Sequence, residues 1–268
     1  MKILFFGDLV GRPGRRAMAA YLKQLTAEQR PDVVIANGEN VTHGFGLSEG
    51  HYQDLLASGV DIVTGGNHIW DRREIVQYIA NAPQLLRPAN MPASMPGTGA
   101  KVFEIRGHKI GVINLMGQVF MGSNTTPPWE SLEQAIPAVK QQTPVLFVDF
   151  HAEATAEKIS LAHFASRLGV SAFVGTHTHV QTADDRILND RMGYLTDAGF
   201  NGAYNSVIGM GVDGSLVRLK SLVPQRLEVA DSDVVQVNAV QFTVDGTTGV
   251  CRGVERINTV MNLANYLP

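Results

Sequence analysis

Short apolar runs alternate with stretches of helical periodicity through the first third of the chain. Runs with no polar alternation are typical of strands that are buried on both faces. The predicted strands are residues 2–6, 32–36 and 61–64, and the helices that follow them are residues 15–29, a short helix with Ser48 as N-cap, and residues 71–80. The order strand, polar loop, helix, repeated three times, predicts a largely parallel sheet with right-handed crossovers.

The rest of the chain adds further strands around two irregular segments. Predicted elements are a hairpin of residues 101–105 and 109–115, a buried strand at 144–149, a helix at 155–168, a strand at 172–174, and antiparallel strands at 193–196, 234–244 and 250–257 that close a second sheet. The proline-rich residues 83–99 and the loop at residues 117–129 read as surface excursions. We therefore predict a single α/β domain over residues 1–268, with a small cap or wall formed by these two excursions.

The composition limits the kinds of protein and the kinds of partner that fit this chain. The chain has 268 residues, 44% of them hydrophobic and 18% charged, with a net charge of −3, which is ordinary for a globular protein. This balance gives no reason to expect a stable nucleic acid partner. The single cysteine, Cys251, excludes an internal disulfide. With no apolar run of membrane-spanning length, we expect a cytoplasmic protein without membrane contact. A homo-oligomer is compatible with this size, but no sequence feature indicates one.

Candidate metal ligands follow the predicted strands. The pair His177 and His179 comes just after residues 172–174, but a His-x-His pattern alone is a weak signal, and each of the other residues alone is an ordinary turn, cap or loop residue. Ligands of open α/β sheets bind outside the carboxyl ends of the strands, so such residues can converge. Five strand ends carry a candidate: Asp8, Glu39 with Asn40, Asn67 with His68, His151, and His177 with His179. Together they predict a metal site.

The chemistry of this set limits the metal and the reaction. Its donors are nitrogen and oxygen without sulfur, which favours iron or manganese, with zinc also compatible, over a closed structural zinc site. Apart from His68, the set offers seven ligands, which are too many for one ion, whereas two divalent or mixed-valence ions that share a carboxylate would use them all. Two such ions indicate in-line displacement at phosphorus or hydrolysis of an acyl group.

The same residues carry a family resemblance. The order Asp8, Gly38-Glu39-Asn40, Gly66-Asn67-His68, His151 and Gly175-Thr176-His177-Thr178-His179 resembles the calcineurin-like metallophosphoesterases. Longer strings are similar to the bacterial YmdB-type branch: Asn37-Gly38-Glu39-Asn40, Gly66-Asn67-His68-Ile69-Trp70-Asp71, His151-Ala152-Glu153-Ala154-Thr155, Thr196-Asp197-Ala198-Gly199 and Ser206-Val207-Ile208-Gly209. The resemblance implies a four-layer α/β/β/α sandwich, in which two central sheets are flanked by helices and hold a dinuclear site.

The resemblance also implies a role for each ligand. One ion would take Asp8, Glu39, Asn40 and His179, and the other Glu39, Asn67, His151 and His177, so that Glu39 bridges. The chain departs from the wider superfamily at Asp8-Leu9-Val10, where a ligand histidine is usual, and in its bridging glutamate, where an aspartate is usual. Asn40 resembles the replacement ligand of the YmdB-type branch.

A reaction follows from these parts. A hydroxide that bridges the two ions would attack phosphorus, and His68 would protonate the departing oxygen as general acid. His43 is a candidate substrate contact. The leading prediction is a phosphodiesterase for small cyclic nucleotides, with 2′,3′-cyclic ones as candidates. The alternatives are a broader phosphoesterase for monoesters or other diesters, and a regulatory metal-binding protein with low turnover. Metallo-β-lactamase-like hydrolases continue His-x-His with Asp-His, which is absent after His179.

Overall fold

Two sheets form the centre of the protein. The computed structural model describes residues 1–122, 124–222, 224 and 226–266. The larger sheet has eight strands in the order β2-β12-β13-β1-β3-β4-β5, with β14 paired to β13. Its strands are β1 (Lys2–Phe6), β2 (Asp8–Leu9), β3 (Val33–Asn37), β4 (Ile62–Thr64), β5 (Leu85–Leu86), β12 (Phe200–Ala203), β13 (Val234–Val244) and β14 (Cys251–Asn262). Strands β1, β3, β4 and β5 run parallel, as the repeated strand-loop-helix pattern predicts.

The smaller sheet has six strands in the order β10-β11-β9-β8-β7-β6. These are β6 (Ala100–Ile105), β7 (His108–Met116), β8 (Leu146–His151), β9 (Ala172–Thr176), β10 (Arg186–Leu188) and β11 (Met192–Leu195). Strands β6 and β7 form the predicted hairpin, whose turn residues Arg106 and Gly107 both have positive φ. Strands β7, β8, β9 and β11 are parallel.

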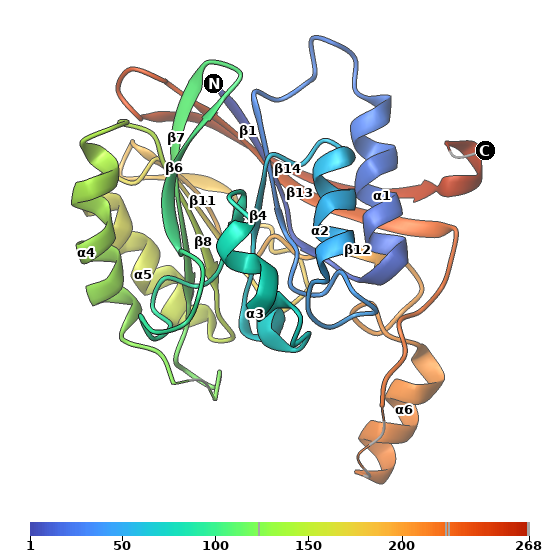
Figure 1. Ribbon diagram of the computed structural model, residues 1–268. Coiled ribbons are helices and arrows are strands. Elements are labelled where there is room, and N and C mark those ends of the chain that lie inside the picture. Colours follow the sequence, from blue (N-terminus) through green and yellow to red (C-terminus); the bar gives the residue numbers. More distant parts are fainter. Residues whose placement is uncertain (123, 223, 225, 267–268) are drawn as a thin grey trace.

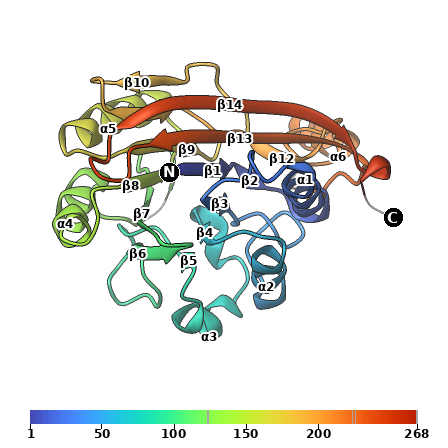
Figure 2. The ribbon, with the colours of Figure 1, turned by 90° about the horizontal axis from the view of Figure 1, so that it is seen from above.

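Helices cover the outer face of each sheet (Figures 1 and 2). Helices α1 (Gly11–Gln24), α2 (Glu49–Ala57) and α3 (Ile75–Tyr78) belong to the half that contains the larger sheet, and α4 (Pro128–Lys140) and α5 (Thr155–Arg167) pack on the smaller one. The short 3-10 helices are η1 (Asn67–Trp70), η2 (Ile79–Asn81) and η3 (Leu263–Asn265). Helix α6 (Val212–Ser221) projects away from both sheets (Figure 1). Within the described residues, every helix is too short or too polar to cross a lipid bilayer.

Alternating side chains of the central strands divide the core into three layers. In β1, Ile3 and Phe5 face the space between the sheets, while Leu4 and Phe6 face the helices of the larger sheet. The ring of Phe5 lies 5.3 Å from that of Phe147 on β8, centroid to centroid, so it joins the two sheets directly. Because each central strand is apolar on both faces, it can be covered on both sides. The predicted four-layer α/β/β/α arrangement is confirmed.

Two predicted elements differ from the structure. The predicted helix at residues 71–80 is shorter in the structure, where α3 begins only at Ile75 and is followed by the 3-10 turn η2. Ahead of α3, the side chain of Arg72 donates to the carbonyl oxygens of Thr42 and Phe45 and ties residue 72 to the preceding glycine-rich loop. The strands predicted to close one second sheet are divided between the two sheets. Strand β11 runs parallel to β9 in the smaller sheet, whereas β13 and β14 pair antiparallel in the larger one.

Hydrogen bonds hold both irregular segments in place. Residues 83–99 contribute β5 and then fold around the buried guanidinium of Arg87, which donates to the carbonyl oxygens of Pro88, Met95 and Pro96. The loop that follows β7 is held to α5, because the backbone N–H of Gln118 donates to Glu157 Oε1. A role for either segment as cap or wall stays a prediction.

Candidate metal centre

The parallel strands bring all seven candidate ligands to one edge of the two sheets. Asp8 lies just beyond β1, Glu39 and Asn40 follow β3, and Asn67 follows β4, all in the larger sheet. His151 is the last residue of β8, and His177 and His179 follow the neighbouring β9 in the smaller sheet. The carboxyl ends of these strands meet where the sheets face one another, as open α/β sheets require for a ligand site.

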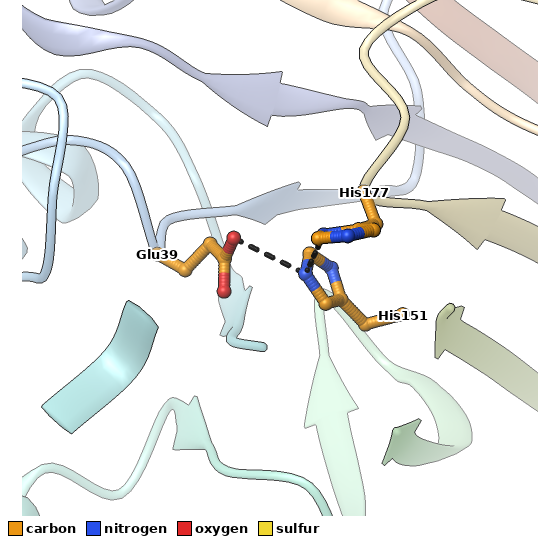
Figure 3. Close-up of side chains that lie close together, drawn as sticks. All are labelled: Glu39, His151 and His177. Carbon is orange, nitrogen blue, oxygen red and sulfur yellow. Dashed lines mark hydrogen bonds and ion pairs between the residues drawn. The ribbon is translucent and has the colours of Figure 1, made fainter. Parts of the chain in front are cut away.

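One group of candidate ligands surrounds His151 (Figure 3). His151 Nε2 lies 3.1 Å from Glu39 Oε1, 3.1 Å from His177 Nδ1 and 2.9 Å from Asn67 Oδ1. Ligand atoms of Glu39, His151 and His177 all lie within 4.8 Å of one another. An ion with metal–ligand bonds of about 2.0–2.2 Å holds its ligand atoms roughly 3–3.5 Å apart, so small side-chain movements suffice to bind one here.

A second group lies on the other side of Glu39. Asn40 Nδ2 is 3.2 Å from Glu39 Oε1, 3.3 Å from His179 Nε2 and 3.5 Å from Asp8 Oδ1. The distance from His179 Nε2 to Asp8 Oδ1 is 3.7 Å. Rotation of the Asn40 amide by half a turn would bring its oxygen to the same place. Glu39 Oε1 therefore contacts both groups.

The negative charge of Glu39 and the positive charge of His151 stabilise each other. Burial disfavours the charged form of both, but their mutual attraction and hydrogen bond outweigh it, lowering the pKa of Glu39 to about 2 and raising that of His151 to about 9. Burial, followed by the neighbouring His151 charge, lowers the pKa of His177 to about 3. The His177 ring is therefore neutral at pH 7 and keeps a lone pair for a cation.

The second ring nitrogen of each histidine has its own partner. His151 Nδ1 lies 2.9 Å from Thr176 Oγ1, whose hydroxyl donates to Asp149 Oδ1 over 2.8 Å. His179 Nδ1 donates to the carbonyl oxygen of Ile208 over 2.9 Å. His177 Nε2 lies 3.1 Å from Glu153 Oε2. Such partners fix ring orientation and tautomer, so the nitrogens that face the two groups are free to bind metal.

Comparison with known proteins identifies the family. A family model described as YmdB-like protein matches residues 4–257. The chain belongs to the YmdB-like family. It is 41% identical over 257 residues, 96% of each chain, to the 2′,3′-cyclic-nucleotide 2′-phosphodiesterase of Bacillus subtilis. The solved structure of a phosphatase from Mycoplasma pneumoniae superposes with a TM-score of 0.89 and 36% identity, covering 100% of this chain and 96% of that one.

A more distant likeness concerns the fold alone. The 5′-nucleotidase precursor of Thermus thermophilus superposes with a TM-score of 0.57 at 15% identity, and the match covers 99% of this chain and 55% of that one. The resemblance read from the strand-end motifs is confirmed by the family model and the Bacillus subtilis relative, and the fold by the superposed structures. The names of the YmdB-like relatives also confirm the predicted enzyme class, a phosphoric ester hydrolase.

In this YmdB-like protein, His68 sits at the rim of the Glu39 group. Its backbone N–H donates to Glu39 Oε2 over 2.9 Å, and its Nδ1 lies 2.8 Å from Asp71 Oδ2. The ring meets the Phe45 ring edge to face, with centroids 5.1 Å apart. About a third of the side chain is exposed (33%), and Asp71 and Phe45 contact the ring.

His43 lies outside the two ligand groups. Three residues beyond Asn40, it is exposed, and its ring lies beside that of His51, with centroids 6.2 Å apart. It lines a cavity of about 510 Å³, together with residues of the α1 start and of the segment at 226–231. Arg12, Arg15 and Arg226 contribute positive charge to this cavity, and Glu228 and Asp231 negative charge.

Several residues around the centre had no role in the sequence prediction. Asp71 and Glu153 stand inside motif strings that carried the family resemblance, three residues after His68 and two after His151, so their spacing was a usable signal. Asp149 and Thr176 are different, because each lies within a buried strand and reads as part of the sheet core. Only the pairing of β8 with β9 brings them together below His151.

Proposed function

We propose that this chain is a dinuclear metal-dependent phosphodiesterase that hydrolyses 2′,3′-cyclic nucleotides. The observation that carries this proposal is the position of Glu39, fully buried, with Oε1 within 3.2 Å of both His151 Nε2 and Asn40 Nδ2. A carboxylate between two groups of nitrogen and oxygen ligands is what a pair of ions needs. The Bacillus subtilis relative, named for this reaction, supports the choice of substrate.

The residues present fit two ions. Asp8, Asn40 and His179 would hold one ion with Glu39, and Asn67, His151 and His177 would hold the other with the same Glu39. Each imidazole has its second nitrogen engaged elsewhere, and the set contains no sulfur, so iron, manganese or zinc suits it. The attraction of Glu39, which raises the pKa of His151, marks this as a place that favours positive charge.

The chain's own groups supply orientation and a proton. When bound, two ions lower the pKa of water and neutralise the charge that develops on the phosphoryl group. As hydroxide from water adds to phosphorus, His68, anchored by Asp71, would give its Nε2 proton to the ribose oxygen whose bond to phosphorus breaks, and the product is a nucleoside monophosphate. The backbone bond from His68 to Glu39 Oε2 keeps this acid beside the metal ligands.

The test compares turnover of 2′,3′-cyclic AMP, 3′,5′-cyclic AMP and p-nitrophenyl phosphate by manganese-loaded protein. We expect the 2′,3′-cyclic diester to have the highest kcat/KM, and His68→Asn to lower kcat by about 10²–10⁴-fold with unchanged metal content. The matched control is His163→Asn, at an exposed position of α5. Full activity of His68→Asn would remove the acid assignment, and no cleavage by fully loaded wild-type protein would contradict the proposal.

A broader phosphoesterase is the second candidate. The Mycoplasma pneumoniae structure, 36% identical to this chain, is named a phosphatase, which favours monoesters as substrates. The same assay separates the two candidates. A kcat/KM for p-nitrophenyl phosphate equal to or above that for the cyclic diester would favour the phosphatase reading.

A further inference from the structure

The turn that carries His177 and His179 adopts a conformation that ordinary residues avoid. His177 has φ of 103° and His179 has φ of 67°, both in the left-handed region. In an extended strand these two side chains would point to the same face. Here His177 lies with the His151 group and His179 with the Asp8 group. The disfavoured backbone is thus what divides the two imidazoles between the two ligand groups.

A buried carboxylate holds the residue between them. Asp197 Oδ2 accepts the backbone N–H of Thr178 over 3.2 Å and the Thr178 hydroxyl over 2.7 Å. Asp197 Oδ1 accepts the N–H of Gly199 over 2.8 Å, and the Asp197 backbone exchanges hydrogen bonds with Thr182. The turn is therefore tied to Asp197 in its middle, and the chain three residues beyond His179 is tied to Asp197 as well.

Lys158 supplies the balancing charge. Its Nζ lies 2.6 Å from Asp197 Oδ2, and each side chain is only 1% exposed. The lysine stem from α5 passes close to the strand that leads into the turn, because a Cβ at Gly175 would lie 2.9 Å from Lys158 Cδ. A buried ion pair of this kind costs desolvation, so its stability contribution alone is a weak reason for its presence.

We propose that Lys158 and Asp197 are a positioning pair that fixes the turn at residues 177–179 so that each histidine meets its own metal ion. The proposal rests on the dinuclear centre proposed above. It also gives a role to the motif Thr196-Asp197-Ala198-Gly199, which contributes no candidate ligand. Strand β11 runs parallel to β9, so Asp197 emerges at the same sheet edge as the two histidines.

The first test titrates Mn²⁺ into metal-free protein by calorimetry. Thr178→Val removes one hydroxyl bond to Asp197 and keeps the ion pair, and we expect Mn²⁺ affinity to fall about 10–100-fold, as with other partners of metal ligands. Thr178→Ser restores the hydroxyl and should restore the affinity. The matched control is Thr143→Val, at a buried position in the loop before β8, which loses the 2.9 Å bond that the hydroxyl donates to the Lys109 carbonyl and the 3.2 Å bond that it accepts from the Val145 N–H. Equal affinities of Thr178→Val and Thr143→Val would overturn the proposal.

The second test needs no metal. We expect amide hydrogen exchange of residues 177–179 in metal-free protein to be faster in Thr178→Val and in Asp197→Asn than in Thr143→Val. Wild-type exchange rates in folded Thr178→Val would overturn the positioning role even if Asp197→Asn fails to fold. The two proposals can fail separately. Wild-type protein that binds no Mn²⁺ would contradict the dinuclear centre, whereas exchange still reports whether the pair fixes the turn.

Discussion

Glu39 is the residue that contacts both candidate ligand groups. It is fully buried, and burial alone would favour its neutral form, yet the His151 charge and hydrogen bond lower its pKa to about 2. A carboxylate that stays ionised in such a place attracts positive charge, whether as a proton on His151 or as a metal ion. Neutral replacements of the same shape therefore test its role directly.

Glu39→Gln should lose at least one of the two ions. The amide keeps the volume of the side chain but removes the negative charge that both groups share, so we expect metal content to fall from two ions per chain to one or none. Metal analysis after gel filtration measures this. Glu49→Gln, at an exposed position in the first turn of α2, is the control. A Glu39→Gln protein that retains two ions would contradict the bridging assignment.

Thr176→Val should weaken the His151 group without removing a ligand. The Thr176 hydroxyl accepts from His151 Nδ1 and donates to Asp149, whose pKa burial raises to about 7. Loss of this link frees the ring, so we expect metal affinity about 10–100-fold lower and a stability loss of about 1–3 kcal/mol from the unpaired buried groups. Metal titration and chemical unfolding measure the two effects, and wild-type affinity would show that the ring needs no such anchor.

Gly66 lies between β4 and η1, at a position where neighbouring side chains leave no room for a Cβ atom. A Cβ there would overlap Glu39 Oε2 and the His151 ring, so the backbone passes where a side chain has no room. Sequence pattern alone marks Gly65-Gly66 only as a turn. The connection from β4 to Asn67 is therefore shaped by two candidate ligands from elsewhere in the chain, Glu39 after β3 and His151 at the end of β8.

Gly66→Ala should displace Glu39 and His151 and lower metal content below that of wild type. The control is Gly50→Ala in α2, where nothing lies within 4 Å of the added Cβ and alanine should stabilise the helix by about 0.5–1 kcal/mol. Metal analysis measures the metal content of both variants, and thermal unfolding measures their stability. Normal metal content in Gly66→Ala would mean that the two side chains can move aside without cost to binding.

The candidate centre joins the two halves of the molecule. The larger sheet carries Asp8, Glu39, Asn40 and Asn67, and the smaller sheet carries the three histidines. An ion that binds across this junction binds only the folded arrangement, since the ligands come from distant parts of the chain. Metal binding should therefore stabilise the whole fold and not one element.

Addition of Mn²⁺ at about 100 times its Kd should raise the free energy of unfolding by about 2.7 kcal/mol for each independent ion. For a chain of this size, that is a rise in Tm of roughly 5–10 °C per ion. Differential scanning calorimetry of metal-free and Mn²⁺-loaded protein measures the shift, and Glu39→Gln should reduce it. An unchanged Tm would mean that the ions do not bind at the junction of the sheets.

The sequence was sufficient for the local features, and it named the candidate ligands that the fold brings together. Apolar runs marked the central strands because strands covered on both faces need no polar alternation. The polar residues at the carboxyl ends of these strands predicted the position of the candidate site, since parallel strands end at a common edge. These inferences need only the local pattern of residues and one general rule of sheet topology. The five strand ends that carry candidate ligands depend on both.

Only the tertiary structure decided how distant residues meet. It assigned β11 to the smaller sheet beside β9, and so brought Asp197 under the turn of His177 and His179. It likewise paired Lys158 of α5 with Asp197, and Asp149 with Thr176. Each of these residues alone reads as core or surface, because a hydrogen bond between strands depends on pairing and register. Those long-range contacts leave no mark in the local pattern of a single sequence.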